Sequence, residues 1–192
     1  MKRLLSLSAL LLCSVLSFAF EVDEIAYNVT SEKNLTVEVT RKQPKYSGDV
    51  VIPDKVTYDQ KEYTVTSIDW HAFEDCSGLT SIDIPNSVTI IEGKAFYNCS
   101  GLTSIDIPNS VTSIEGEAFY NCSGLTSVTI PNSVTSIGFA AFALCSGLTS
   151  VDIPNSVTYI SDDAFYYCNG LTSITIGNSV TYINRYAFRN CI

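Results

Sequence analysis

The chain contains 192 residues, of which 46% are hydrophobic and 16% are charged. This length suits one ordinary domain or one short repeat array, and the composition excludes disordered, collagen-like and multi-span membrane proteins. The net charge is −9, and it becomes −11 if an N-terminal segment carrying Lys2 and Arg3 is removed. Such a charge repels phosphate backbones and anionic lipid surfaces, so we expect no nucleic-acid partner.

The N-terminus has the parts of a secretory signal peptide. Lys2 and Arg3 form a basic start, residues 4–16 are apolar, and small residues at Ser17 and Ala19 occupy the positions that a signal peptidase inspects. We predict a signal peptide over residues 1–19, cleaved after Ala19. The alternative is an uncleaved anchor, although the apolar run over residues 4–20 is at the short limit for a membrane span. No later segment is apolar enough to span a bilayer.

The rest of the chain is dominated by an internal repeat of 23 residues. The unit is C-S-G-L-T-S-I-x-I-P-N-S-V-T-x-I-x-x-x-A-F-x-x, and we predict about five such repeats over residues 65–192. Six cysteines keep this interval: Cys76, Cys99, Cys122, Cys145, Cys168 and Cys191.

The parts of the unit predict local structure. In the repeat that begins at Cys99, residues 102–107 alternate apolar and polar side chains, as a strand with one buried face does, and Pro108 ends this strand. Residues 111–114 are expected to form a second short extended segment, and residues 117–122 a helical or 3₁₀ turn. Gly124 is expected to close the coil with a positive φ. One unit cannot bury its apolar face alone, so we expect an α/β-type solenoid, a right-handed superhelix with short parallel strands.

The unit resembles the BspA-like leucine-rich repeats, which are found on the surfaces of anaerobic gut and oral bacteria. The similarity covers residues 65–191. It implies a leucine-rich-repeat fold, an exported protein at the cell surface, outside the cell or in the periplasm, and adhesion to host or microbial macromolecules. The family supplies no catalytic residues and no cofactor, so none is expected here.

Residues 20–64 look like the β-rich N-terminal cap of that family. Residues 25–30 and 35–40 alternate in polarity and are expected to pair as neighbouring strands. The residues inserted after Pro53 are interpreted as a hairpin with Asp59 and Gln60 at its tip.

The cysteines have two interpretations. Exported chains with an even number of cysteines usually form disulfides. However, equivalent residues in adjacent coils point the same way at about 4.8 Å, whereas the Cβ atoms of a disulfide lie about 3.8 Å apart and face each other. We therefore favour a buried ladder of free thiols, and we expect no metal site because His71 is the only histidine.

Two sets of residues are candidate ligand contacts. The first contains polar positions between the buried strand residues: Ser81, Asp83, Ser104, Asp106, Ser127, Thr129, Ser150 and Asp152. Asp83 and Asp106 could share a cation such as Ca²⁺, but two solvated carboxylates are the simpler interpretation.

The second set is aromatic: Trp70 in a variable loop, and Tyr159 and Tyr182 in one column. Such side chains can anchor a partner, but Trp70 could also pack over the junction between cap and repeats. A further column of Tyr97, Tyr120, Tyr166 and Tyr167 suits either ligand contact or packing between coils.

These features indicate a binding module for a protein or glycan rather than an enzyme, because one loop histidine does not provide a catalytic triad. The alternative is a structural envelope scaffold, or a decayed or truncated paralogue with no ligand of its own. The chain stops at Cys191-Ile192, before another strand would begin, which predicts an uncapped end with end-on self-association as one consequence.

Overall fold

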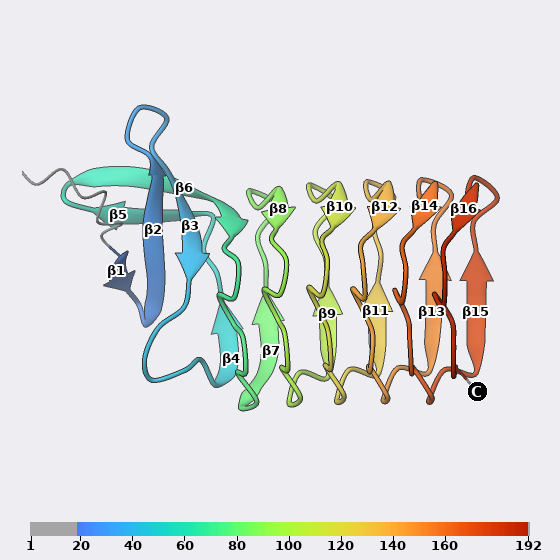
Figure 1. The fold of residues 1–192 in the computed structure, drawn as a ribbon. Coiled ribbons are helices and arrows are strands. Elements are labelled where there is room, and N and C mark those ends of the chain that lie inside the picture. Colours follow the sequence, from blue (N-terminus) through green and yellow to red (C-terminus); the bar gives the residue numbers. More distant parts are fainter. Residues whose placement is uncertain (1–18, 192) are drawn as a thin grey trace, which may run out of the picture.

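Successive repeats form coils that stack side by side, so that equivalent strands line up along the molecule (Figure 1). The computed structural model describes residues 19–191. The predicted signal peptide lies outside these residues except for Ala19, which begins the first strand. Within residues 19–191 the regular elements are all strands, and none is a helix long and apolar enough to cross a membrane.

Each coil contributes one longer strand to what we call the long-strand side. These strands are β4 (Gly48–Val51), β7 (Leu79–Asp83), β9 (Ser104–Asp106), β11 (Ser127–Thr129), β13 (Ser150–Ile153) and β15 (Ser173–Ile176). Strands β9 to β15 form one parallel sheet, and β4 pairs with β7 beside it. Paired residues such as Ser104 and Ser127 are one repeat apart, so the repeat length fixes the register.

Each coil also contributes a two-residue strand to the short-strand side. These strands are β8 (Ile90–Ile91), β10 (Ser113–Ile114), β12 (Ser136–Ile137), β14 (Tyr159–Ile160) and β16 (Tyr182–Ile183). Strands β10 to β16 form a second parallel sheet. The second residue of each strand from β8 to β14 is a buried isoleucine, which places the short-strand side over the same core.

The N-terminal region forms a sheet with the order β1-β2-β3-β6-β5, built from β1 (Ala19–Val22), β2 (Ile25–Ser31), β3 (Thr36–Thr40), β5 (Lys55–Tyr58) and β6 (Lys61–Ile68). Strands β2 and β3 pair as expected, while β1 was not anticipated. Strands β5 and β6 form the expected hairpin, and Asp59 (φ 47°) and Gln60 (φ 61°) at its tip have the left-handed backbone of a type I′ turn. Strand β6 also pairs with β8, which joins this sheet to the coils.

The core of the solenoid is a column of stacked phenylalanine rings, one from each Ala-Phe pair. Neighbouring ring centroids lie 5.0–5.3 Å apart, and the rings are 4–9° from parallel. The members are Phe73, Phe96, Phe119, Phe142, Phe165 and Phe188. Each inner ring contacts one ring on either side, so the column packs every coil against both of its neighbours.

The cysteines form a second column beside the phenylalanines. All six are thiols, and the first five are buried. The thiol of Cys122 donates a hydrogen bond to the carbonyl of Phe96 in the preceding coil at 3.1 Å, and Cys99, Cys145, Cys168 and Cys191 repeat this contact at 3.0–3.1 Å. A cysteine therefore fills apolar space at this position and also satisfies a buried backbone acceptor.

The prediction of a helical or 3₁₀ turn around each Ala-Phe pair is wrong. Hydrogen bonds within the coil, such as Tyr97 N–H to the Lys94 carbonyl (3.1 Å), alternate with bonds to the next coil, such as Phe96 N–H to the Ala118 carbonyl (2.8 Å). Lys94 (φ 58°) and Asn98 (φ 59°) also have left-handed backbone, which no α- or 3₁₀-helix contains. The segment is a series of tight turns, because half of its N–H groups are needed to hold the neighbouring coil.

The expected role of the repeat glycine is also wrong. Among the described glycines, positive φ occurs at Gly48 and not at Gly124. Instead, a Cβ atom added at Gly124 would lie 2.4 Å from the carbonyl oxygen of Ser100 in the preceding coil. Glycine is required here because two backbones approach too closely for any side chain.

Candidate binding surfaces

The polar residues predicted to contact a ligand lie together on the long-strand side, in two lines that we call the polar rows. One row contains Ser81, Ser104, Ser127 and Ser150, and the other contains Asp83, Asp106, Thr129 and Asp152. These side chains are exposed, except that Ser81 is half-buried. The structure thus presents the eight predicted residues on one hydrophilic face, where their hydroxyl and carboxylate oxygens offer regularly spaced hydrogen-bonding groups.

The aspartates of the polar rows are dispersed rather than clustered. Asp83 and Asp106 come from the neighbouring strands β7 and β9, while Thr129 lies between Asp106 and Asp152. Within residues 19–191 no group of three or more metal-ligating side chains is present. The Asp83 and Asp106 side chains are both exposed to solvent.

One member of the polar rows was missed by sequence reasoning. Asp49 on β4 is paired with Ser81 and extends the serine row by one coil. Its carboxylate accepts hydrogen bonds from the hydroxyls of Ser81 (2.6 Å) and Thr80 (2.8 Å), and these bonds lower the pKa of Asp49. The Ser81 hydroxyl is therefore already engaged, whereas the serines farther along the row are exposed.

Trp70 lies in the loop after β6 and projects from the first coil. Its side chain is 57% exposed, and its ring stacks on that of His71 with centroids 5.4 Å apart. More than half of the Trp70 side chain is therefore accessible to a partner.

Tyr159 and Tyr182 lie beside each other on the short-strand side, on β14 and β16. Tyr159 is 39% exposed and Tyr182 is 66% exposed, with ring centroids 6.4 Å apart. The side-chain amide of Asn184 donates a hydrogen bond to the Tyr159 hydroxyl. The tyrosine pair and the polar rows come from different sheets, so the structure does not unite the predicted residues in a single site.

A third group of aromatic side chains surrounds a hollow on the surface of the Ala-Phe turns, which we call the turn face. The hollow measures about 470 Å³ and is lined by Tyr97, Glu117, Tyr120, Phe139, Ala140, Ala143, Asp163, Tyr166, Tyr186 and Arg189. Sequence reasoning noted some of these tyrosines but missed Phe139, which is 50% exposed. The available signal was its departure from the repeat, since glycine occupies this position in two earlier repeats.

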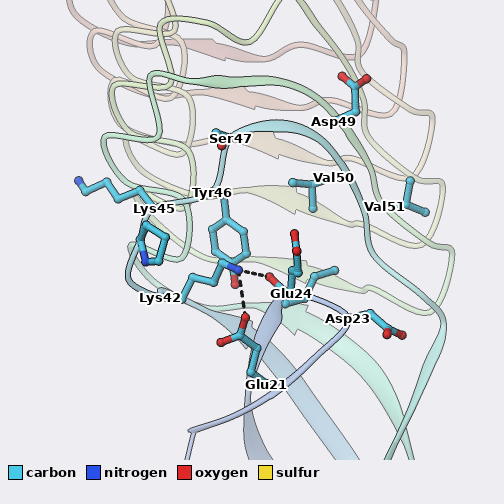
Figure 2. Close-up of a pocket in the computed structure, with 12 residues that line it drawn as sticks. Glu21, Asp23, Glu24, Lys42, Lys45, Tyr46, Ser47, Asp49, Val50 and Val51 are labelled. Carbon is cyan, nitrogen blue, oxygen red and sulfur yellow. Dashed lines mark hydrogen bonds and ion pairs between the residues drawn. The ribbon is translucent and has the colours of Figure 1, made fainter.

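A further hollow of about 390 Å³ lies between the N-terminal sheet and β4 (Figure 2). Figure 2 shows the Lys42 ammonium group bound to the Glu21 carboxylate, at 3.1 Å, and to the main-chain carbonyl of Glu24. Lys45 forms an ion pair with Asp75 at 3.1 Å. Lys42 is thus engaged within the cap, and Lys45 joins the cap to the first coil, which makes this hollow a weaker candidate site than the turn face.

Comparison with known proteins places the fold among bacterial leucine-rich-repeat proteins. A leucine-rich repeat protein from Bacteroides ovatus ATCC 8483 is 39% identical with a TM-score of 0.82, over 90% of this chain and 45% of that one. The T. pallidum leucine-rich repeat protein TpLRR is 30% identical with a TM-score of 0.78, over 87% of this chain and 75% of that one. A leucine-rich repeat protein from Eubacterium ventriosum ATCC 27560 is 26% identical with a TM-score of 0.74, over 91% and 44%.

This chain spans less than half the length of the B. ovatus and E. ventriosum proteins. A search of curated proteins gives no match. The profile of the BspA type leucine rich repeat region matches residues 66–192 in six copies, which is most of the chain. The 23-residue unit, the stacked coils and this match together establish that the chain belongs to the BspA-type leucine-rich-repeat family.

Proposed function

We propose that this protein is exported to the bacterial surface and binds a protein or glycan there without catalysing a reaction. The observation that carries the proposal is the exposure of Trp70, Tyr159 and Tyr182 on an otherwise well-packed scaffold. A folded chain gains little from large aromatic side chains in water, but a partner that buries them gains apolar contact and stacking. Tryptophan and tyrosine are accordingly the residues most enriched where binding energy concentrates in interfaces.

The scaffold favours binding because it is already ordered before a partner arrives. Backbone hydrogen bonds such as that from Phe119 N–H to the Ala141 carbonyl (2.8 Å) connect each coil to the next. A partner therefore loses little free energy to ordering this surface, which is a main cost of association. The polar rows would supply hydrogen bonds around such a contact.

The proposal is tested by binding of purified residues 20–192 to immobilised host matrix proteins and mucosal glycans. The test variant combines Trp70→Ala, Tyr159→Ala and Tyr182→Ala, and the control is Tyr58→Ala, which removes an exposed aromatic side chain on β5, away from the polar rows and the hollows. We expect at least a tenfold loss of affinity for the bound ligand in the triple variant and none in the control. Equal binding by all three proteins would contradict the role of these side chains.

The second candidate is a structural envelope scaffold without a ligand. The two functions differ in location, since a surface binding protein is exposed to the medium and a periplasmic scaffold is not. Protease added to intact cells should remove the protein if the proposed function is correct. Complete protection, with digestion after the outer membrane is opened, would favour the scaffold.

A further inference from the structure

One coil of the turn face lacks the side chains that its neighbours carry. Tyr97, Tyr120 and Tyr166 occupy equivalent positions in three repeats, but the repeat between the last two has Ala143. Where two such tyrosines are adjacent, as Tyr97 and Tyr120 are, their rings stack with centroids 4.7 Å apart and 3° from parallel. The column thus continues on both sides of a coil from which one ring is missing.

The same coil is also small at the position that is charged in its neighbours. Ala140 stands where the adjacent coils have Glu117 and Asp163. Ala140 and Ala143 are both buried and form the floor of the turn-face hollow. Two alanines in one coil, with larger residues before and after, create the hollow.

The walls and rim of the hollow combine aromatic rings with carboxylates. Tyr120, Phe139 and Tyr166 contribute rings, and Glu117 and Asp163 contribute acidic groups. The Lys94 ammonium lies 3.6 Å from the Glu117 carboxylate and forms an ion pair with it. Asp163, in contrast, has no ion-pair partner within residues 19–191. The lining carries these two carboxylates against one cationic side chain, Arg189, and the whole chain has a net charge of −9, so the hollow favours a cation over an anion.

The turn face already holds cationic side chains on its tyrosine rings. The guanidinium of Arg189 lies 4.8 Å from the ring centroid of Tyr186, and both residues line the hollow. At the other end of the face the Lys94 ammonium lies 5.6 Å from the ring centroid of Tyr97. These internal contacts show the chemistry that a partner's side chain would repeat in the space between them.

We infer that the hollow above Ala140 and Ala143 binds an arginine side chain of a partner protein. Its planar guanidinium stacks on the rings of Tyr120 and Tyr166 and donates hydrogen bonds to the carboxylates of Glu117 and Asp163. An arginine suits the site better than a lysine because a guanidinium both stacks on aromatic faces and presents several donors in one plane. This inference deepens the proposed function by naming the partner's chemistry, but it does not depend on the exposed aromatic residues tested there.

The test uses residues 20–192 labelled with ¹³C at the alanine methyl groups. The protein is titrated with N-acetyl-L-arginine methylamide, with the citrulline analogue, which has the same shape without the charge, and with methyl β-D-glucopyranoside. We expect saturable shifts of the Ala140 and Ala143 methyl signals with the arginine probe and at least fivefold weaker binding of the other two. Equal binding of citrulline would overturn the cation site, and stronger binding of the glucoside would identify a glycan site instead.

Two variants and a control locate the site independently of the labels. Ala143→Tyr restores the residue found in neighbouring repeats and fills the hollow, so arginine binding should be lost. Asp163→Asn should weaken it at least threefold. Ser136→Tyr adds a tyrosine on the short-strand side, outside the hollow, and should leave binding unchanged. Undiminished binding by Ala143→Tyr, with methyl signals elsewhere intact, would refute the inference. If the hollow binds the arginine probe but the protein binds none of the matrix proteins or glycans, the proposed function is refuted and this inference is not.

Discussion

The cysteine column makes the stability of this protein sensitive to alkaline pH. Burial raises the pKa of the Cys76 thiol to about 11 and that of Cys145 to about 12, and it also raises the pKa of Cys122 well above its ordinary value. The cause is the same in each case, since a thiolate would lose its hydration in the apolar core. The ordinary pKa of a cysteine thiol, which applies in the unfolded chain, is 9.0.

The sign and size of the effect follow from proton linkage. Between pH 9 and pH 11 the folded protein keeps these protons while the unfolded chain releases them, so the unfolded chain binds fewer protons and stability falls as pH rises. A thiol whose folded pKa is about two or more units above 9 contributes on the order of 1 kcal/mol of this loss between pH 9 and pH 10. These three thiols together contribute a loss of about 3 kcal/mol, a large fraction of the roughly 5–15 kcal/mol typical of a folded domain. Cys168 adds to this loss, because its neighbour Cys191 and its burial also raise the pKa of its thiol.

The loss is measured as the free energy of urea unfolding at pH 8, 9 and 10, under reducing conditions that keep the thiols free. The matched variant is Cys122→Ala combined with Cys145→Ala, which removes two of these thiols and should lose about 2 kcal/mol less than the parent over the same interval. Staying at or below pH 10 limits the contribution of Tyr27, whose pKa burial raises to about 12. If the variant and the parent lose stability equally, buried thiols do not control the alkaline transition.

Three further predictions concern packing and thiol reactivity. Gly124→Ala should lower the free energy of urea unfolding by about 1–3 kcal/mol or more, because the added Cβ atom would lie 2.4 Å from a carbonyl oxygen. Gly116→Ala, whose Cβ atom would have its nearest neighbour at 3.5 Å, should be close to neutral. Equal effects of the two substitutions would contradict the close approach of the backbones at Gly124. Phe119→Leu interrupts two ring stacks, so its loss of unfolding free energy should exceed the loss expected from reduced apolar burial by about 1–3 kcal/mol. Phe188→Leu interrupts one stack, and this excess should be about half as large. Cys191 is half-buried while the other five repeat cysteines are buried, so iodoacetamide should modify Cys191 first in the folded protein. Uniform labelling of the six thiols by mass spectrometry would argue against this.

The sequence was sufficient for those features that depend on the repeat interval. The 23-residue spacing predicted strands that pair in register, as Ser104 and Ser127 do. The alternation of polarity predicted buried and exposed strand residues, and the inserted residues around Asp59 and Gln60 predicted the hairpin. In each case the determinant is local, because side-chain period or turn geometry is set by a few consecutive residues.

The sequence was insufficient where one coil determines the backbone of the next. Residues 117–122 have the composition of a short helical turn, but the Phe119 N–H bonds to Ala141 of the following coil rather than within its own segment. Gly124 was attributed to a turn, although the oxygen that excludes a side chain belongs to Ser100, one coil earlier. Both errors arise because the deciding contact joins residues more than 20 positions apart, which a local pattern does not reveal.

The same dependence between coils indicates which positions of the repeat can vary without disturbing the stack. A position inside the core, such as Phe119, contacts the coil before and the coil after, so a substitution there affects both interfaces. The position that holds Trp70 and Phe139 projects from the turns, and its occupant changes among tryptophan, glycine, phenylalanine, aspartate and arginine along this one chain. Because the stacking of coils does not require a particular residue at this position, its residue type reflects contact either with solvent or with a partner. Large exposed aromatic residues are poorly explained by solvent alone, and this is the reason for placing the proposed arginine contact at the turn-face hollow beside Phe139.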